Sequence, residues 1–294
     1  MLSLLIPIYN FDTSELVYEL HAQALNANIN FEILLVDDFS TELKEKNSKL
    51  QNLKHVVYEE LTCNFGRSKI RNYLAGKAKY DNLIFLDCDS GIISIDFIEK
   101  YIQNVDKKIV YGGRIYAKKK PDANYYFHWY YGVNRESQKI EIRKQNPNKG
   151  FQTNNFMIKS EIFNNIKFNE TIKGYGHEDT LFGYELKNRK IEITHIDNPV
   201  IHLGLEKTDD FLRKTKNGLN NLIVLTNLFP DENGLFEDIK VLDYFFKAKK
   251  FYFCGLIKLM YLIFNRLIYW NLKGKNPKLF LFDFYKLGFL CLKF

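Results

Sequence analysis

The feature of this chain that most clearly indicates chemistry is a pair of aspartates spaced two positions apart. The apolar run Leu83–Leu86 leads directly into Asp87, Cys88 and Asp89. Because alternate side chains of an extended segment share a face, both carboxylates can point at one small volume. Unpaired carboxylates held together repel each other, and a divalent cation with oxygen ligands removes that repulsion. The spacing therefore indicates a metal site with open positions for a ligand, although an acidic turn after a core strand is the simpler alternative.

A second acid pair, Asp37-Asp38, also follows an apolar run, Phe31–Val36. Its carboxylates can accept hydrogen bonds from a nucleobase N–H and from ribose hydroxyls. The pair could instead belong to a helix start at which Ser40 or Asp38 is the N-cap residue.

A basic segment, Asn64–Asn72, places Arg67, Lys69 and Arg71 at a predicted helix start. Backbone N–H groups at a helix N-terminus favour anions, and Arg matches the geometry of phosphate oxygens. The segment therefore suits a diphosphate, and the alternative is a solvated basic face without a ligand.

A third acid pair, Glu178-Asp179, follows the glycine-rich segment Gly174-Tyr175-Gly176 and opens a predicted helix. A positioned carboxylate can take a proton from a reacting hydroxyl group. The alternative is that both acids only complement the helix dipole.

The elements that must position these acids alternate between strands and helices. Strands are predicted over residues 2–8, 31–36, 55–58, 83–86, 109–111, 191–196 and 200–203, and helices over 14–26, 68–78 and the segment after 177. This alternation indicates an α/β fold with a mostly parallel sheet flanked by helices. Ligands of such sheets bind beyond the carboxyl ends of the strands, where the first two acid pairs lie.

Composition and cysteine usage narrow the class of protein. The chain has 294 residues, of which 46% are hydrophobic and 26% charged, so a disordered or fibrous protein is excluded. The four cysteines show no C-x-x-C spacing, which favours reduced thiols in a cytosolic setting. The apolar start at Leu2–Ile8 lacks a cationic leader and predicts a strand, so we expect no export.

The net charge of +7 is concentrated in the C-terminal tail. From Lys240 onward there are eleven Lys and Arg side chains against Asp243 and Asp283, so the rest of the chain is close to neutral. The body therefore carries no electrostatic footprint for nucleic acid, and we expect no nucleic-acid partner.

Four motifs at the strand ends resemble those of family 2 glycosyltransferases, which have the GT-A fold. They are Leu5-Ile6-Pro7-Ile8-Tyr9-Asn10, Leu35-Val36-Asp37-Asp38-Phe39-Ser40, Asn64-Phe65-Gly66-Arg67 with Arg71-Asn72, and Leu86-Asp87-Cys88-Asp89. Order and spacing both match over roughly residues 1–205. The resemblance implies an inverting transferase that uses a nucleotide-activated sugar, usually a UDP-sugar, and a divalent metal. Phe39 departs from the family pattern, in which glycine is usual.

The resemblance also implies which residues bind the donor. Pro7 and Tyr9 belong to the nucleotide-binding set, Asp37 or Asp38 holds the base and ribose, Arg71 lies near the nucleotide, Asp87 faces the ribose, and Asn154 contacts the donor sugar. An Asn pair such as Asn154-Asn155 is also ordinary turn chemistry.

Catalytic and metal-binding roles follow from the same resemblance. The glycine-aromatic-glycine segment with Glu178-Asp179 is similar to that of several sugar transferases, which makes Asp179 the catalytic base and lets Glu178 hold an acceptor hydroxyl. Asp89 is the implied metal ligand, and His202 completes the metal shell, with His195 as the competing candidate. A nitrogen ligand favours Mn²⁺ over Mg²⁺.

The tail at residues 244–294 combines dense aromatics, few acids and regularly spaced lysines. At about 100° per residue, Lys258, Arg266 and Lys273 share one sector of a predicted helix over 251–272 that is otherwise nearly all apolar. This pattern predicts a helix lying in a membrane interface, with lysines attracted to anionic lipid. Residues 280–294 predict a second such segment. The alternative is a helical appendage that packs on the core or on a second subunit.

The sequence as a whole predicts a GT-A-like catalytic domain over residues 1–205 and a basic, aromatic helical extension over 206–294. The expected reaction is transfer of a hexose or N-acetylhexosamine to a glycan or lipid-linked acceptor, at the cytoplasmic face of the cell membrane. One alternative is a catalytically inactive, membrane-associated glycan-binding or assembly factor. Another is a sugar nucleotidyltransferase, although the G-G-x-G-x-R pattern of those enzymes is replaced here by Pro7-Ile8-Tyr9-Asn10.

Overall fold

The structure is a computed structural model that describes residues 1–149, 151–171, 174, 176–229, 235–236 and 239–294. These residues form two compact units. Unit 1 comprises Met1–Ala117, Glu136–Lys173 and Glu178–Gly204, and unit 2 comprises Lys118–Arg135, Gly174–His177 and Leu205–Phe294.

Unit 1 contains a seven-stranded sheet whose strand order is β3-β2-β1-β4-β8-β6-β9. Its strands are β1 (Leu2–Ile8), β2 (Phe31–Asp37), β3 (Val56–Glu60), β4 (Asn82–Leu86), β6 (Ile109–Tyr111), β8 (Asn155–Lys159) and β9 (Ile193–His195). All neighbouring pairs are parallel except those made by β8, which is antiparallel to β4 and to β6. The predicted mostly parallel sheet is confirmed, but the sequence did not predict β8.

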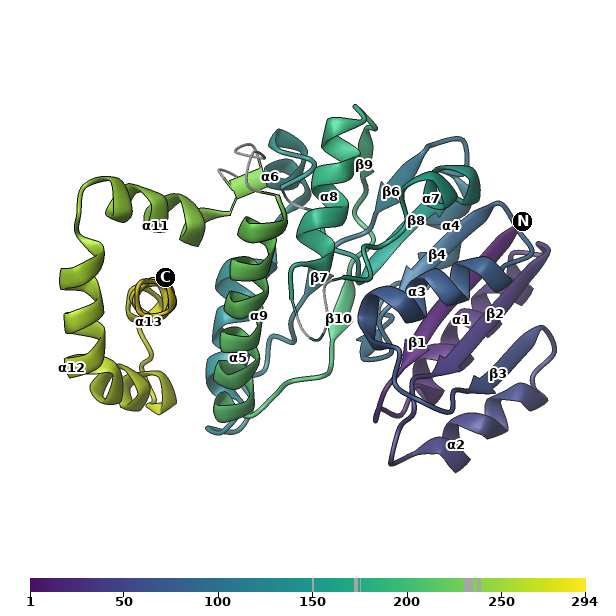
Figure 1. Ribbon diagram of the computed structural model, residues 1–294. Helices are drawn as coiled ribbons and strands as arrows, with labels where there is room; N and C mark the ends of the chain where they lie inside the picture. The colour runs from purple at the N-terminus through teal and green to yellow at the C-terminus, as the bar shows by residue number, and fades with distance from the viewer. Residues whose placement is uncertain (150, 172–173, 175, 230–234, 237–238) are drawn as a thin grey trace. The chain divides into compact units, whose positions relative to one another are not determined.

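Helices cover both faces of this sheet (Figure 1). One face packs against α1 (Ser14–Asn26) and α4 (Phe97–Ile102), and the other against α3 (Gly66–Lys77), α7 (Ser160–Ile166) and α8 (Glu178–Asn188). The period-two alternation of the strands explains this sandwich. In β4, for example, Ile84 and Leu86 join the first cluster, whereas Leu83 and Phe85 join the second.

A small three-stranded sheet, in the order β5-β10-β7, completes unit 1. It is formed by β5 (Ser90–Gly91), β7 (Arg114–Ile115) and β10 (Val200–His202). The pairing of His202 with Ser90 brings the end of β10 beside the acidic turn that follows β4. Three short helices complete the unit: α2 (Lys44–Ser48), a 3₁₀ helix (Lys49–Asn52) and α6 (Ile140–Gln145).

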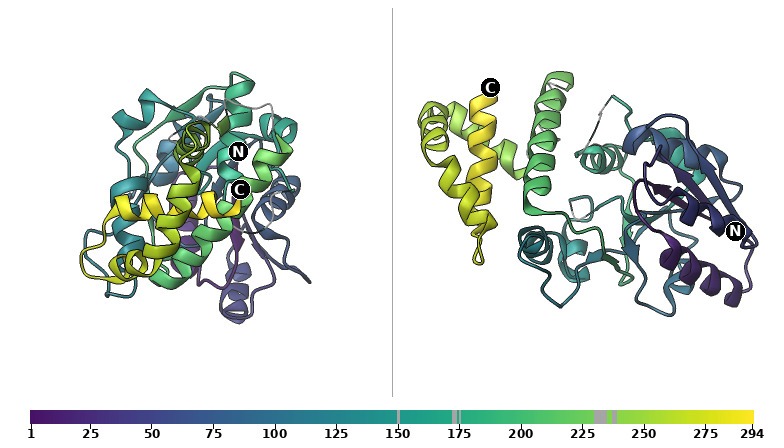
Figure 2. Two further views of the ribbon diagram at one scale, coloured as in Figure 1. Left: turned by 60° about the vertical axis from the view of Figure 1, so that its left-hand side comes forward. Right: turned by 90° about the horizontal axis from the view of Figure 1, so that it is seen from below.

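Unit 2 is helical in its described part, as the sequence predicted for the tail. It contains α5 (Tyr126–Tyr131), α9 (Thr208–Leu228), α11 (Lys240–Lys250), α12 (Cys254–Lys273) and α13 (Leu279–Lys293), and a π-helical turn, Gly132–Glu136, follows α5. The yellow helix α13 lies within the bend formed by α11 and α12 and also packs on α9 (Figures 1 and 2). Edge-on and tilted contacts among the rings of Phe127, Phe211 and Phe282 lie in the core of unit 2.

Within the described residues, no helix on its own has the length and apolar composition needed to cross a membrane, while α11 and α12 taken together, bent by 119°, meet that test.

Candidate active site

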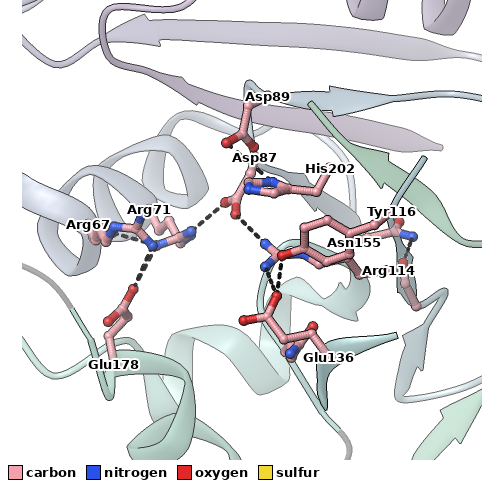
Figure 3. A network of polar contacts seen from close by, with 12 residues as sticks. Arg67, Arg71, Asp87, Asp89, Arg114, Tyr116, Glu136, Asn155, Glu178 and His202 are labelled. Carbon is pink, nitrogen blue, oxygen red and sulfur yellow. Dashed lines mark hydrogen bonds and ion pairs between the residues drawn. The ribbon is translucent and has the colours of Figure 1, made fainter. Parts of the chain in front are cut away.

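Asp87 lies at the centre of a network of charged side chains at the carboxyl end of β4 (Figure 3). Its Oδ1 accepts a hydrogen bond from Arg71 Nη2 at 2.6 Å, and its Oδ2 lies 3.5 Å from Arg114 Nη2. The carboxylate is therefore neutralised by two guanidinium groups, and the expectation of two unpaired aspartates does not hold for Asp87. The physical reason is that Arg71, on α3, and Arg114, on β7, reach the same strand end from opposite sides.

Arg71 is almost fully buried, and its position limits what it can bind. Besides Asp87, it donates to the carbonyl of Arg67 at 3.2 Å and lies 4.0 Å from Glu178. Both terminal nitrogens of Arg71 thus donate to protein groups, and one of them holds Asp87 in place. The predicted role of Arg71 beside the nucleotide stays a prediction.

Arg114 connects Asp87 to a second acid. Its Nη1 donates to Glu136 Oε2 at 3.1 Å, and the same oxygen accepts a hydrogen bond from the hydroxyl of Tyr116. Burial opposes the charge of Arg114, but Glu136, Tyr116 and Asp87 keep its pKa well above the ordinary value. The network therefore contains a permanently charged, buried guanidinium.

Asp89, two residues after Asp87, contacts His202 at the end of β10 (Figure 3). His202 Nδ1 lies 3.4 Å from Asp89 Oδ2. Asp89 Oδ1 is buried and has no hydrogen-bond partner among the described residues. Burying a carboxylate oxygen without a hydrogen-bond donor costs free energy, and a cation bound to that oxygen would offset the cost. This atom therefore fits a site for a cation.

The backbone holds Asp89 tightly. Its carbonyl accepts from the N–H of Leu203 at 2.8 Å, and a Cβ added to Gly204 would lie 2.1 Å from Asp89 Oδ2. Burial would raise the pKa of Asp89, yet His202, Arg114 and Arg67 lower it well below its usual value. Asp89 is therefore held as an anion.

The described residues contain no cluster of three or more His, Cys, Asp or Glu side chains that could enclose a metal ion by themselves. Asp89 and His202 would thus provide two ligands and leave the other coordination positions open. This donor set of one oxygen and one nitrogen fits Mn²⁺, and open positions suit the oxygens of a diphosphate.

His195, the competing candidate, is excluded as a ligand by its partners. Its Nε2 lies 3.0 Å from the carbonyl of Pro147, and its Nδ1 lies 3.2 Å from Arg143 Nη1. Burial lowers the pKa of His195 to about 4, so the ring is neutral and both nitrogens are used in holding β9.

Glu178 and Asp179 begin α8, as predicted, but their environments differ. Glu178 is buried, and its Oε1 lies 3.2 Å from Arg67 Nη1. Burial opposes its ionisation, yet Arg67 and Arg71 lower its pKa below the ordinary value. Glu178 is therefore held as an anion by cations of α3.

Asp179 has the opposite shift. Burial, reinforced by the adjacent charge of Glu178, raises the pKa of Asp179 to about 6. Its Oδ1 accepts a hydrogen bond from the N–H of Thr180 at 2.8 Å. A carboxyl group with this proton affinity is suited to general base catalysis near neutral pH.

Asp37 and Asp38 hold the loop after β2. Asp37 Oδ1 accepts from the N–H of Ser40 at 2.6 Å, and Asp38 Oδ2 accepts from the N–H of Gly66 at the start of α3 at 2.9 Å. Burial, with Asp37 nearby, raises the pKa of Asp38 despite its two backbone hydrogen bonds. Both acids thus build the loop, and their predicted contact with base and ribose stays a prediction.

The same loop explains the unusual Phe39. Its φ is +66°, in the left-handed region that favours glycine. Asn10, at φ +47°, accepts hydrogen bonds from the backbone of Thr41 and Glu42 and fixes the loop after β1. The turn therefore keeps a glycine-like backbone, with Phe39 exposed. Pro7 lies within β1 and Tyr9 is exposed just beyond it.

Asn154 lies next to Asp87, whose N–H donates to its carbonyl at 3.1 Å. Its side chain is buried, and both amide atoms lack a partner among the described residues. The neighbouring Asn155 instead hydrogen-bonds the carbonyls of Gly113 and Asn198 at 2.9 Å each and is structural. Asn154 therefore remains a candidate ligand, while Tyr175 and part of its glycine-rich segment lie outside the described residues.

Arg67, Arg114 and Glu136 belong to the network although they were not selected as site residues. Arg67 was noted within the basic segment, and its half-exposed guanidinium is more accessible than that of Arg71. Arg114 follows Gly112-Gly113 at the end of β6, which is a strand-end signal that could have identified it.

Comparison with known proteins assigns the chain to a sequence family. The sequence profile of glycosyl transferase family 2 matches residues 3–167, more than half of the chain. The chain belongs to this family. Proteins of this family transfer glycosyl groups. No curated protein matches the chain in sequence.

Solved structures show the same fold at low sequence identity. The chain is similar to TarS 1-349 of S. aureus, with a TM-score of 0.50 and 18% identity over 76% of this chain and 65% of that one. It is similar to mannosyl-3-phosphoglycerate synthase of Rubrobacter xylanophilus, with a TM-score of 0.54 and 13% identity over 78% and 74%. It is also similar to the mannosyltransferase PcManGT of Pyrobaculum calidifontis in complex with GDP-Man and Mn²⁺. The TM-score is 0.52 and the identity is 12% over 77% of this chain and 64% of that one. The chain spans only 38% of the longer TarS structure.

These structures are GT-A glycosyltransferases, so the predicted fold class and the family resemblance are both confirmed.

Proposed function

We propose that this glycosyltransferase catalyses inverting, metal-dependent transfer of a hexose or N-acetylhexosamine from a nucleotide sugar to a hydroxyl of a glycan or lipid-linked acceptor. The observation that carries the proposal is the buried, unpartnered Oδ1 of Asp89 beside the imidazole of His202. A divalent cation bound there would satisfy an atom that the described residues leave without a donor.

Asp89 and His202 are the residues that would hold the cation. When bound, the cation would supply positive charge that stabilises the departing nucleoside diphosphate. The nitrogen of His202 favours Mn²⁺, and the similar PcManGT structure contains Mn²⁺.

Asp179 is the proposed base. The acceptor oxygen forms a bond to the anomeric carbon as the bond from that carbon to the diphosphate oxygen breaks. The hydroxyl proton passes to the carboxylate of Asp179, and the diphosphate leaves with the electron pair. A pKa near 6 leaves Asp179 ionised at pH 7 and makes it a stronger base than an ordinary aspartate. Such base catalysis contributes about 10²–10⁴-fold.

The remaining residues position the donor in this proposal. Asp87, fixed by Arg71 and Arg114, faces the ribose, and the free amide of Asn154 contacts the sugar. Arg67 is the cation with accessible surface for the diphosphate. We propose a UDP-sugar as the donor.

The test is an assay of sugar transfer and of slow donor hydrolysis with Mn²⁺. Donors are UDP-glucose, UDP-galactose, their N-acetylated amines and GDP-mannose, and NMR of the product reports the anomeric configuration. We expect the transfer rate of Asp179→Asn to be lower than that of the wild type by at least about 10²-fold, although the variant still binds the donor. We expect the product of the wild type to show inversion at the anomeric carbon.

Asp122→Asn, which changes an exposed aspartate of unit 2, is the matched control and should retain wild-type activity. Equal hydrolysis rates for the wild type and Asp89→Asn would contradict the proposal and favour an inactive glycan-binding factor. Retention of the anomeric configuration would contradict the inverting mechanism.

A further inference from the structure

Helix α12 has an exposed apolar face in addition to the face it buries within unit 2. Tyr261, Ile268 and Leu272 are buried on the side that packs against α13. On the other side, seven large apolar side chains are between 39% and 61% exposed: Leu256, Leu259, Met260, Ile263, Phe264, Leu267 and Trp270. At about 100° per residue these seven span an arc of about 140°, and its centre lies about 130° from the centre of the buried side. We call them the apolar arc.

A contiguous apolar surface of this size is unusual for a soluble protein and marks an interaction site. Scattered exposed apolar residues would need no explanation. Here, however, the seven follow one another along four turns of a single helix. The face therefore requires an apolar partner.

Cations border the apolar arc on one side. Viewed along the helix axis, Lys258, Arg266 and Lys273 lie between the buried face and the apolar arc. They are about 40° to 120° away from the edge of the buried face. Lys273 is paired with Asp209 at 2.9 Å, Arg266 lies over the ring of Trp270 at 5.5 Å, and Lys258 has no ion pair among the described residues. After Asp243, Asp283 is the one remaining acid of the chain. The partner is therefore both apolar and anionic.

Aromatic residues stand at the two ends of the helix. Phe251, Tyr252 and Phe253 form an exposed turn before α12, and Trp270 lies in its last turns. Aromatic rings of this kind favour the boundary between hydrocarbon and headgroups.

We propose that the apolar arc of α12 docks this glycosyltransferase onto an anionic lipid bilayer, with the helix axis in the plane of the surface. Seven side chains enter the acyl boundary, and the bordering cations extend to phosphate headgroups. A dry interface with a second copy of the chain would bury Lys258 and Arg266 without acids opposite them, since α12 contains no acidic residue. The bilayer alone satisfies both the apolar arc and its cations.

The test measures flotation of the full chain with vesicles of phosphatidylcholine alone and of phosphatidylcholine mixed with phosphatidylglycerol. We expect binding to the anionic vesicles, weakened by high salt. The double variant Ile263→Ser with Leu267→Ser should reduce bound protein at least about tenfold, and Lys258→Gln with Arg266→Gln should remove the preference for anionic vesicles. Thermal unfolding of both variants should match that of the wild type, because all four side chains are exposed.

The matched control is Leu25→Ser with Ile95→Ser, which removes two exposed apolar side chains of unit 1 and should leave flotation unchanged. Three results would overturn the proposal. They are no flotation of the wild type, a dimer that the Ile263→Ser, Leu267→Ser variant dissociates, and a clear loss of thermal stability in that variant, which would mean that the apolar arc is covered in the folded chain.

Discussion

Glu178 and Asp179 are adjacent in the chain, yet the structure shifts their proton affinities in opposite directions. Two guanidinium groups of α3 hold Glu178 as an anion. Burial, reinforced by that fixed negative charge, raises the pKa of Asp179 to about 6. A pair of acids whose environments separate their pKa values in this way is typical of acid and base assignments in enzymes. Asp179, the residue that we propose as the base, is the one of the two whose pKa is raised.

This arrangement predicts a pH profile. Asp179 acts as a base only when ionised, so kcat/KM should fall as the pH decreases through about 6. In Glu178→Gln the adjacent negative charge is absent, so the pKa of Asp179 decreases and the acidic limb should move by up to about one unit toward lower pH.

The control for that profile is Glu185→Gln on the same helix, whose partner Arg189 is on the surface. It should leave the limb in place. An acidic limb that does not move in Glu178→Gln would contradict the role given to Asp179.

The bridge from Arg114 to Asp87 and Glu136 predicts a second effect. Lysine keeps the charge but cannot span both acids, because it lacks the planar fork of arginine. Arg114→Lys should raise the KM for the donor by about tenfold with a smaller change in kcat, since Asp87 loses one of its two restraints.

Arg213→Lys is the comparison for Arg114→Lys, because Arg213 pairs with Asp210 at the exposed surface. Its kinetics should equal those of the wild type. An unchanged donor KM in Arg114→Lys would show that this bridge does not position the donor.

The sequence identified the acids of this site better than their partners. Asp89 and His202 are far apart in the chain, and the family resemblance joined them as the structure does. Arg114 and Glu136 lie in a segment without a motif, and β7, which pairs with β10 in the small sheet, brings Arg114 to Asp87 only in the folded chain. Periodicity carries no information about such side-chain pairs.

At the scale of elements, β8 shows where the prediction was incomplete. Turn chemistry is the alternative that the sequence leaves open for the Asn154-Asn155 pair, but Asn155 begins a buried strand paired with both β4 and β6. Only Phe156, Met157 and Ile158 of this strand are apolar. So short an apolar run gives no clear period and does not distinguish a strand from a buried helix. The tertiary partners of Asn155, including the hydroxyl of Tyr101 at 2.6 Å from its Oδ1, decide the structure.

The small sheet of unit 1 offers a direct test of how elements position the metal ligands. A methyl group at Gly204 would collide with Asp89 Oδ2, so Gly204→Ala must displace either Asp89 or the end of β10. We expect a loss of at least about tenfold in Mn²⁺ affinity, together with a destabilisation of about 1–3 kcal/mol.

Gly76→Ala is the matched control, because a Cβ there meets no atom within 4 Å. It should keep Mn²⁺ binding and, as a Gly→Ala change within a helix, should be neutral or stabilising. Wild-type Mn²⁺ affinity in Gly204→Ala would show that Asp89 is not held as the structure indicates.

At the scale of the whole molecule, the sequence predicted the fold class because strands, helices and strand-end motifs all indicated one architecture. The helices of the tail were predicted as well. The sequence did not indicate that the aromatic-rich segment Lys118–Arg135 belongs with the tail to unit 2. That grouping depends on ring contacts such as Phe127 with Phe282, which join residues far apart in the chain.

The proposed reaction depends on a cation bound by Asp89 and His202. Measuring Mn²⁺ binding by electron paramagnetic resonance tests that site most directly. In the presence of UDP, the wild type should bind one Mn²⁺ ion per chain. Asp89→Asn should weaken that binding at least about tenfold, because the amide removes the charged oxygen ligand, while Asp122→Asn should bind as the wild type does. Equal Mn²⁺ affinity in the wild type and Asp89→Asn would contradict the central claim.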